Sequence, residues 1–348
     1  MNKVYKTGQV HILGAGSIGS LFGFHLRKAG VPVTLIFRNK EKSARFKEWG
    51  SRVGILDNYG KNQEAGETEN IVEFEGGFGV LDAPELGGTA SCVSESNRIE
   101  KLLVTTKAFD AVAGIARIYP YLSTNPEIML LLNGMGVLEK VETFFKNEGR
   151  EKYPRIYVGT TTHGCMPLQQ EFSYSHTGFG SCHISEYTTG HPQMELGDSE
   201  FVASMISTGL NTGYVPKRTM DTLLLKKLAI NAIINPVSAL ANCKNGLVFA
   251  KADSVYPALI PELGAEISRI IKRIPGIETK DEFSAENVIR YAFETSQSTC
   301  NNDSSMKVDY DRGNRTEIDY INGYFLKLGE EYGVDAKINR MLCKLIKE

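Results

Sequence analysis

A glycine-rich turn near the start of the chain limits the fold more than any other feature. It runs from Gly14 to Gly19 with the pattern G-x-G-x-x-G and follows a buried-strand pattern at residues 9–13. A helical pattern continues to about Ala29, where Gly30 ends it, and a second apolar strand follows at residues 32–37. Such a strand, turn and helix in one βαβ unit are typical of a dinucleotide-binding site, where the glycines allow a tight turn and a close approach of the pyrophosphate. An ordinary glycine-rich turn is the alternative.

The residues after the second strand indicate which nicotinamide cofactor is used. A site that prefers NAD usually ends this strand in Asp or Glu, but here the strand is followed by Arg38, Asn39 and Lys40. A guanidinium forms bidentate, charge-assisted contacts with phosphate, so we predict NADPH. Surface charges of no special role are the alternative. The predicted phosphate-binding residues are Gly14, Ala15, Gly16, Ser17, Ile18, Gly19 and Arg38.

Two further strands end in polar residues. The strand pattern at residues 102–106 leads to Lys107, and that at 128–132 leads to Asn133. Ligands bind at the carboxyl ends of strands in doubly wound sheets, so Lys107 is a candidate for cofactor or substrate contact and Asn133 for orienting a nicotinamide or a substrate carbonyl. An exposed loop lysine and a hairpin turn are the alternatives. A helical pattern at residues 137–141 argues against the hairpin.

The length of 348 residues predicts two domains. Residues 1–215 are expected to form an α/β, Rossmann-type dinucleotide-binding domain, and residues 216–348 an all-α domain. Between residues 48 and 100 the signals are short and β-like, which predicts a small antiparallel excursion from the parallel sheet.

Composition excludes several classes of function. Lys plus Arg (39) nearly balances Asp plus Glu (41), so the net charge of -2 predicts no nucleic-acid or membrane partner. The six cysteines contain no C-x-x-C pair, and no metal site is expected. Nothing in the sequence spaces His163 or His176 with a partner side chain, so both are expected to be structural. Without a signal-peptide pattern or a run of about 20 apolar residues, the protein is expected to be cytoplasmic.

A polar stripe marks the helical pattern at residues 225–236. Lys227, Asn231 and Asn235 recur every four residues, which places them on one face of an otherwise apolar helix. Buried amides and ammonium groups need polar partners, so this face is expected to line a cleft, and Pro236 is expected to kink the helix there. The alternative is a solvated pair formed by Lys226 and Lys227, with structural asparagines.

A second polar segment follows near the C-terminus. Thr316 with Asp319 resembles an N-cap with a first-turn acid, so Glu317 would lie at a positive helix start and stay ionised. An ionised Glu317 near Lys227 would keep the lysine protonated. The alternative is that Glu317 only decorates a helix N-terminus.

Taken in order, these motifs resemble the ketopantoate reductase (2-dehydropantoate 2-reductase) family nearly end to end. The most specific pieces are residues 227–236 and 316–323; the others are Gly14 to Gly19, Arg38, Lys107, residues 133–136 and residues 304–306. The resemblance implies an NADPH-dependent reductase with a Rossmann-type N-terminal domain, a helical C-terminal domain and an active site between them. The family makes (R)-pantoate for pantothenate and coenzyme A synthesis.

The resemblance also implies roles for single residues. Lys227 would be the general acid at the C2 carbonyl, supported by Glu317, and the residues that hold a 2-oxo acid substrate would be Asn231, Asn235, Ser305 and Asn133. Asn133 and Glu317 would also lie by the cofactor, whose phosphates would meet Arg38 and Lys107. Asp110 departs from the glutamine often found there, and the segment before Lys107 is long for the family.

Two other functions stay open at this point. One is a reductase of another 2-oxo acid with a different proton donor. The other is an NADPH-binding sensor or scaffold without turnover, which the presence of both Lys227 and Glu317 disfavours. A homodimer is also left open.

Overall fold

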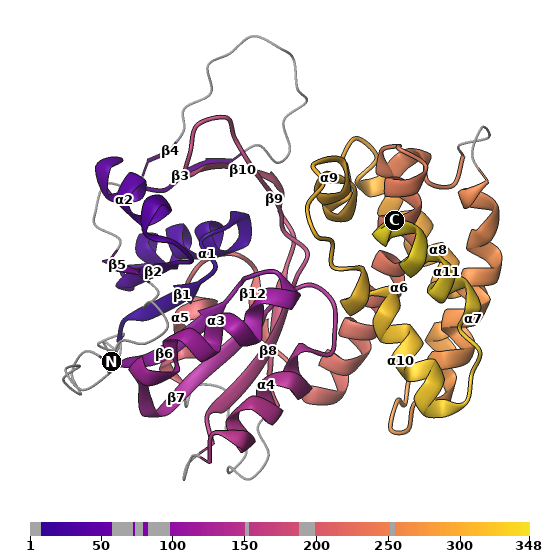
Figure 1. The fold of residues 1–348 in the computed structure, drawn as a ribbon, viewed down its shortest axis with the longest axis horizontal. Coiled ribbons are helices and arrows are strands. Elements are labelled where there is room, and N and C mark those ends of the chain that lie inside the picture. The colour runs from indigo at the N-terminus through magenta and orange to yellow at the C-terminus, as the bar shows by residue number, and fades with distance from the viewer. Residues whose placement is uncertain are drawn as a thin grey trace. The chain divides into compact units, whose positions relative to one another are not determined.

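The computed structural model describes residues 8–57, 98–149, 153–187, 199–250 and 255–348, together with the backbone of residues 72–73 and 79–82. The chain divides into two compact units (Figure 1). The first contains Met1–Leu132 and Leu138–Lys217, and the second contains Asn133–Val137 and Arg218–Glu348. The short loop Asn133–Val137 thus belongs with the C-terminal helices. A single boundary at residue 215 does not describe this division.

The first unit is built on an eight-stranded sheet with the order β12-β11-β8-β7-β6-β1-β2-β5. Neighbouring strands are parallel except for β8 and β11. Valine, isoleucine and leucine dominate the central strands, as expected for strands covered on both faces. The strands are β1 (Val10–Leu13), β2 (Val33–Phe37), β5 (Gly79–Asp82), β6 (Ile99–Val104), β7 (Leu122–Leu131), β8 (Arg155–Thr161), β11 (Cys182–Glu186) and β12 (Thr212–Tyr214).

Helices cover both faces of this sheet (Figure 1). The chain steps from β1 to β2 in one direction and from β6 through β7 to β8 in the other, so right-handed crossovers place the helices of the two halves on opposite faces. This is the doubly wound arrangement, with its switch point between β1 and β6, and it confirms the predicted Rossmann-type α/β fold. The helices are α1 (Ser17–Lys28), α2 (Lys40–Glu48), α3 (Ala111–Ile118), α4 (Val137–Asn147) and α5 (Glu200–Ile206).

A second, four-stranded sheet has the order β4-β3-β10-β9. Its strands are β3 (Gly54–Asp57), β4 (Val72–Glu73), β9 (Gly164–Pro167) and β10 (Ser173–Gly178). The predicted antiparallel excursion is therefore right only in part: β3 and β4 are antiparallel, but β3 also pairs in parallel with β10, more than 100 residues later, and β5 joins the large sheet. Most of the predicted excursion lies outside the described residues.

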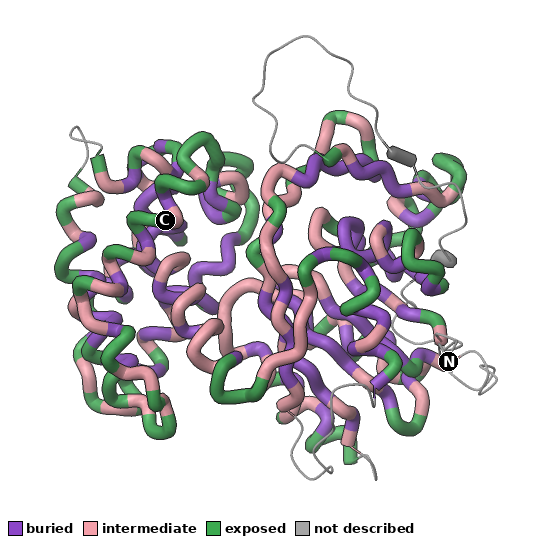
Figure 2. The backbone as a smooth tube through the Cα atoms, turned by 180° about the vertical axis from the view of Figure 1, so that it is seen from behind, coloured by how far each residue is buried: buried purple, intermediate pink, exposed green. Residues whose placement is uncertain are grey.

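The second unit is helical. Its helices are α6 (Lys217–Leu240), α7 (Ile260–Arg273), α8 (Ala285–Ser298), α9 (Ser305–Asp311), α10 (Asn322–Tyr332) and α11 (Lys337–Lys347). By length and composition α6 could cross a membrane, but 67% of its most apolar stretch is buried within the protein. Such burial is typical of a core helix in a globular unit. Each unit has its own buried residues, which lie along the strands of the large sheet in the first and along several helices in the second (Figure 2).

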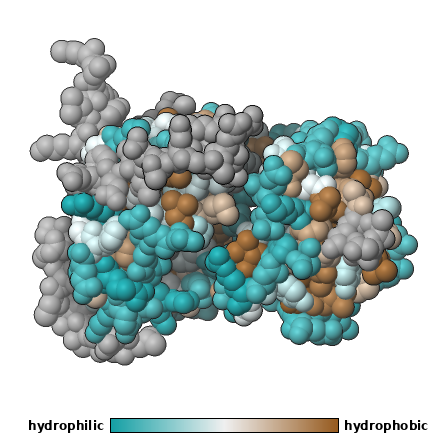
Figure 3. Space-filling model, turned by 90° about the horizontal axis from the view of Figure 1, so that it is seen from above, coloured by the Kyte–Doolittle hydropathy of each residue, from teal (hydrophilic) through white to brown (hydrophobic). Residues whose placement is uncertain are grey.

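The surface seen in Figure 3 is mainly hydrophilic. Large apolar side chains that are exposed in the helical unit include Leu247, Val255 and Phe293.

Pro236 lies inside α6, and the structure shows how a buried helix accommodates it. A proline has no amide hydrogen, so the carbonyl of Ala232, four residues earlier, loses its helical partner. The side chain of Asn322 replaces it: its Nδ2 donates to the Ala232 oxygen at 3.0 Å. Asn322 is fully buried at the start of α10, so this bond ties α10 to the middle of α6.

Candidate functional site

The glycines of the first turn have separate physical roles. Gly14 has φ +111°, and a Cβ there would lie 2.6 Å from the Thr106 nitrogen; a Cβ on Gly19 would lie 2.1 Å from the Gly14 oxygen. At these two positions, backbone atoms of the protein leave no room for a side chain. A Cβ on Gly16, in contrast, would meet nothing within 4 Å, and Gly16 is the exposed N-cap of α1. The open face at Gly16, beside the amides of the first turn of α1, fits the pyrophosphate of a dinucleotide.

Arg38 and Asp110 meet at the carboxyl ends of β2 and β6. The Arg38 guanidinium donates to Asp110 Oδ2 at 3.4 Å, and both side chains are exposed, by 75% and 41%. Asp110 ends the short 3-10 turn Ala108–Asp110, which Lys107 precedes as its half-buried N-cap residue. An exposed ion pair contributes only about 0–1 kcal/mol, so Arg38 can exchange this carboxylate for a phosphate.

In the helical unit, the two neighbouring lysines of α6 have different partners. Lys227 Nζ donates to Asn133 Oδ1 at 3.0 Å. Lys226 Nζ lies 3.7 Å from the centroid of the Tyr291 ring, a cation–π contact. The interpretation of a solvated lysine pair is therefore wrong, because one ammonium is held by an amide oxygen and the other by an aromatic face.

The loop that carries Asn133 is held against the segment that follows Glu317. The Met135 amide donates to the Tyr320 carbonyl at 2.8 Å, and a Cβ on Gly134 (φ +77°) would lie 2.6 Å from the same oxygen. Glu317, only 5% exposed, is the N-cap residue of the 3-10 turn Ile318–Tyr320. The segments of Lys227, Asn133 and Glu317 therefore converge within the second unit.

The predicted helix start at Thr316 and Glu317 is right only in part. Thr316 Oγ1 accepts from the Ile318 amide at 3.5 Å and a helical turn follows, but it is the short 3-10 turn Ile318–Tyr320, and α10 begins at Asn322. Ile321, with ψ -87°, breaks the helical path, and the Tyr320 carbonyl is taken by the Met135 amide. The helical turn that begins after Glu317 thus ends where a distant loop contacts it.

The remaining residues of the polar stripe lie farther along α6. Asn231 is half-buried, and Asn235 is buried. Ser238 Oγ donates to the Asn235 carbonyl at 3.0 Å and lies 2.7 Å from Ser304 Oγ. Ser304 in turn caps α9 by accepting from the Lys307 amide. These bonds hold the segment before Ser305, which is exposed, at the turn of α6 that follows Asn235.

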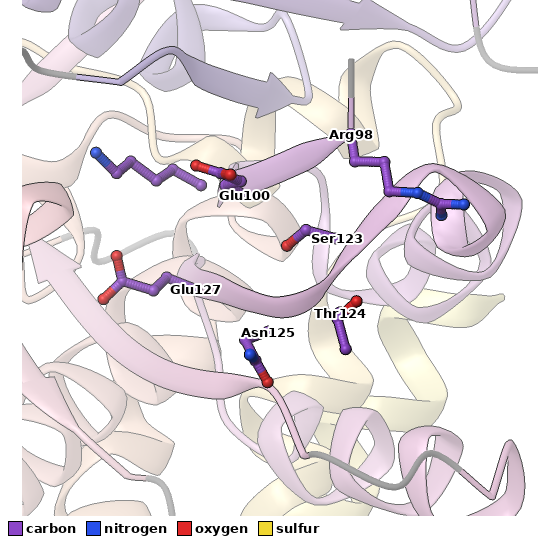
Figure 4. Close-up of a pocket in the computed structure, with 7 residues that line it drawn as sticks. Arg98, Glu100, Ser123, Thr124, Asn125 and Glu127 are labelled. Atoms are coloured by element: carbon purple, nitrogen blue, oxygen red, sulfur yellow. The ribbon is translucent and has the colours of Figure 1, made fainter. Parts of the chain in front are cut away.

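A polar pocket of about 380 Å³ lies elsewhere, at the amino ends of β6 and β7 (Figure 4). Two of its charged groups already have partners within the first unit: Lys101 pairs with Glu200 at 2.8 Å, and Glu127 accepts from the hydroxyls of Tyr157 and Ser199. Ligands of doubly wound sheets bind at the opposite, carboxyl ends of the strands. We therefore place no part of the candidate site there.

Sequence reasoning missed Tyr320 and Asn322, which shape the site through backbone contacts. The glycine at position 134 was the available signal for Tyr320, because a loop glycine can adopt positive φ and often marks a close approach of two backbones. Pro236 was the signal for Asn322, because a proline inside a buried helix leaves one carbonyl that needs a donor.

Comparison with known proteins adds independent findings. The family model described as "Ketopantoate reductase PanE/ApbA" matches residues 10–189, and "Ketopantoate reductase PanE/ApbA C terminal" matches residues 219–348. A relative from Schizosaccharomyces pombe, named "Probable 2-dehydropantoate 2-reductase", is 32% identical over 97% of this chain and 95% of its own.

Solved structures share the fold. A 2-dehydropantoate 2-reductase from Geobacter metallireducens has a TM-score of 0.74 at 19% identity, covering 97% of this chain and 99% of its own. A D-mandelate dehydrogenase, solved with NADH and anilino(oxo)acetate, has a TM-score of 0.72 at 22% identity, covering 97% of both chains.

Proposed function

Because the chain belongs to the ketopantoate reductase family, we propose that it reduces 2-dehydropantoate (ketopantoate) to (R)-pantoate, with NADPH as the reductant. The product would enter pantothenate and coenzyme A synthesis. The relatives named for this activity support the substrate class, and the geometry of the chain's own residues supports the division of tasks.

The bond from Lys227 to Asn133 is the observation that carries the proposal. An ammonium on an apolar helix needs a polar partner, and such a contact fixes the direction of its N–H groups. The Asn133 amide oxygen accepts from Lys227 Nζ at 3.0 Å, which orients the lysine. Lys227 is thus suited to donate a hydrogen bond, and then a proton, to a substrate oxygen.

The reaction needs a hydride and a proton at the C2 carbonyl. NADPH, when bound, supplies the hydride to the carbonyl carbon. Lys227 stabilises the negative charge that develops on the oxygen and donates the proton that completes the hydroxyl group. Asn231, Asn235 and Ser305 hold the hydroxyl and carboxylate of the substrate, and Glu317 supports the lysine. A placed general acid contributes about 10²–10⁴-fold to the rate.

The cofactor assignment rests on the first unit. The open face at Gly16 and the N-terminus of α1 would hold the pyrophosphate, and Arg38 with Lys107 would meet the phosphates at the carboxyl ends of β2 and β6. A guanidinium in place of an acidic residue after β2 favours the 2′-phosphate of NADPH over the ribose hydroxyl of NADH.

Oxidation of NADPH, followed by its absorbance, tests the assignment of substrate. The purified protein is assayed with ketopantoate, with an unbranched 2-oxo acid and with an aromatic 2-oxo acid. We expect kcat/KM for ketopantoate to exceed the others by about tenfold or more, since each misplaced group in a fitted pocket costs roughly 1–3 kcal/mol. Preference for another acid would refute ketopantoate as the substrate but keep the chemistry, and no turnover of any acid would favour an NADPH-binding sensor.

A further inference from the structure

Three side chains of the types that bind metals meet in the first unit, away from the proposed reaction. They are His25 near the end of α1, Asp57 at the end of β3 and His176 on β10. One ligand atom from each lies within 4.8 Å of the other two. Asp57 and His176 are direct partners in the parallel pairing of β3 with β10, so the backbone itself sets their spacing.

A neighbouring histidine, His163, fixes the protonation of His176. The Gly180 amide donates to His163 Nδ1 at 3.1 Å, so that nitrogen carries no proton, and His163 Nε2 donates to the Leu210 carbonyl at 2.9 Å. His176 Nε2 lies 3.0 Å from the same His163 Nδ1. Because an acceptor needs a donor opposite it, the proton of neutral His176 must lie on Nε2.

The consequence is that His176 turns a lone pair towards a carboxylate. Its Nδ1 lies 3.5 Å from Asp57 Oδ1, and the side chain of His176 is fully buried. Two acceptors that face each other in this way repel unless a positive charge lies between them.

We propose that His25, Asp57 and His176 bind one divalent transition-metal ion of the zinc class, with water completing its coordination. Two ligand atoms of a tetrahedral zinc ion lie about 3.4 Å apart when each bond is about 2.0–2.1 Å, which the 3.5 Å between His176 and Asp57 matches. His163 would then fix the tautomer of His176 without touching the ion, as hydrogen-bond partners of metal-binding histidines do.

The ligand set selects the kind of ion. Two imidazoles and one carboxylate suit zinc, cobalt or nickel better than magnesium or calcium, which prefer oxygen.

The site would tie α1 to the second sheet. His25 lies about 12 Å along the helix axis from Ser17, at 1.5 Å per residue, so the metal would be remote from the glycine-rich turn. We therefore expect metal to raise the thermal stability of the protein and to leave its affinity for NADPH unchanged.

Cobalt titration tests the proposal. The full-length protein is treated with a chelator, desalted and titrated with Co²⁺, whose visible absorption reports ordered coordination. We expect one saturable equivalent without the near-ultraviolet band of a sulfur ligand, a band that would reveal binding to a thiol such as the exposed Cys300. One equivalent of Zn²⁺ should raise the Tm.

His25→Gln and Asp57→Asn are the decisive variants, because neither side chain is fully buried and both should fold, as circular dichroism would verify. Each should weaken Co²⁺ binding by about tenfold or more and abolish the Zn²⁺-dependent rise in Tm. His183→Gln, at a half-buried histidine of β11, is the matched control and should bind as the unmodified protein does. Absence of saturable visible bands, or equal binding by His25→Gln, would overturn the proposal.

Discussion

At the scale of single residues, Arg38 and Asp110 form the pair that we propose distinguishes NADPH from NADH. Their exposed ion pair places a carboxylate beside the guanidinium that we assign to the 2′-phosphate. Asp110 would then act against NADPH in two ways, because it would compete for Arg38 and repel the phosphate. We therefore propose that position 110, where the family often has glutamine, tunes cofactor preference.

Substitution of Arg38 should affect the two cofactors differently. Arg38→Ala should lower kcat/KM for NADPH by about 10–100-fold, the effect of a charged hydrogen bond worth about 1.5–3 kcal/mol, and leave the NADH value nearly unchanged. Asp110→Asn should raise the NADPH value by a few-fold. Steady-state kinetics with both cofactors measures this. Arg45→Ala, at an exposed arginine that pairs with Glu171, is the control. Equal losses with NADPH and NADH in Arg38→Ala would contradict the assignment.

At the scale of elements, two glycines of the turn before α1 should have different roles. Gly19 is needed for the fold, and Gly16 would leave room for a ligand. Gly19→Ala should destabilise the protein strongly, because its Cβ would lie 2.1 Å from a backbone oxygen. Gly16→Ala should fold with nearly unchanged Tm, because its φ is ordinary and its Cβ meets no protein atom, but should bind NADPH at least about tenfold more weakly. Thermal unfolding and cofactor fluorescence titration measure the two effects; tight NADPH binding by Gly16→Ala would place the pyrophosphate elsewhere.

The bond from Asn322 to the Ala232 carbonyl predicts a specific rescue. Asn322→Ala removes the donor to that carbonyl and to Asn339 Oδ1, and should lower the free energy of unfolding by about 2–4 kcal/mol. Pro236→Ala restores an amide hydrogen opposite Ala232. In the double variant we expect about 1 kcal/mol of the loss to be recovered. Strictly additive effects in denaturant unfolding would show that Asn322 does not compensate for the proline.

Periodicity and turn chemistry predicted the elements well, because both are local. The strand, glycine-rich turn and helix at Gly14, the all-helical second half and the stripe that begins at Lys227 all follow from spacing within one segment. The partners of these residues could not be predicted in the same way. Lys227 meets Asn133 across 94 residues and Arg38 meets Asp110 across 72, so each contact depends on how distant segments pack.

At the scale of the whole molecule, the two units would have separate tasks. The first would bind the cofactor, and the second would provide the proton. Variants should therefore divide into those that lose cofactor binding, such as Gly16→Ala, and those that bind NADPH normally but do not turn over.

The most direct test is a single-turnover measurement of NADPH oxidation by ketopantoate in Lys227→Ala and Lys226→Ala, with the Kd for NADPH determined on the same samples. The two lysines are adjacent, but only Lys227 bonds to Asn133. We predict that Lys227→Ala keeps its NADPH affinity and loses about 10²–10⁴-fold in rate, while Lys226→Ala stays within a few-fold of the unmodified protein. Near-normal turnover by Lys227→Ala, or equal losses in the two variants, would contradict the assignment of Lys227 as the proton donor.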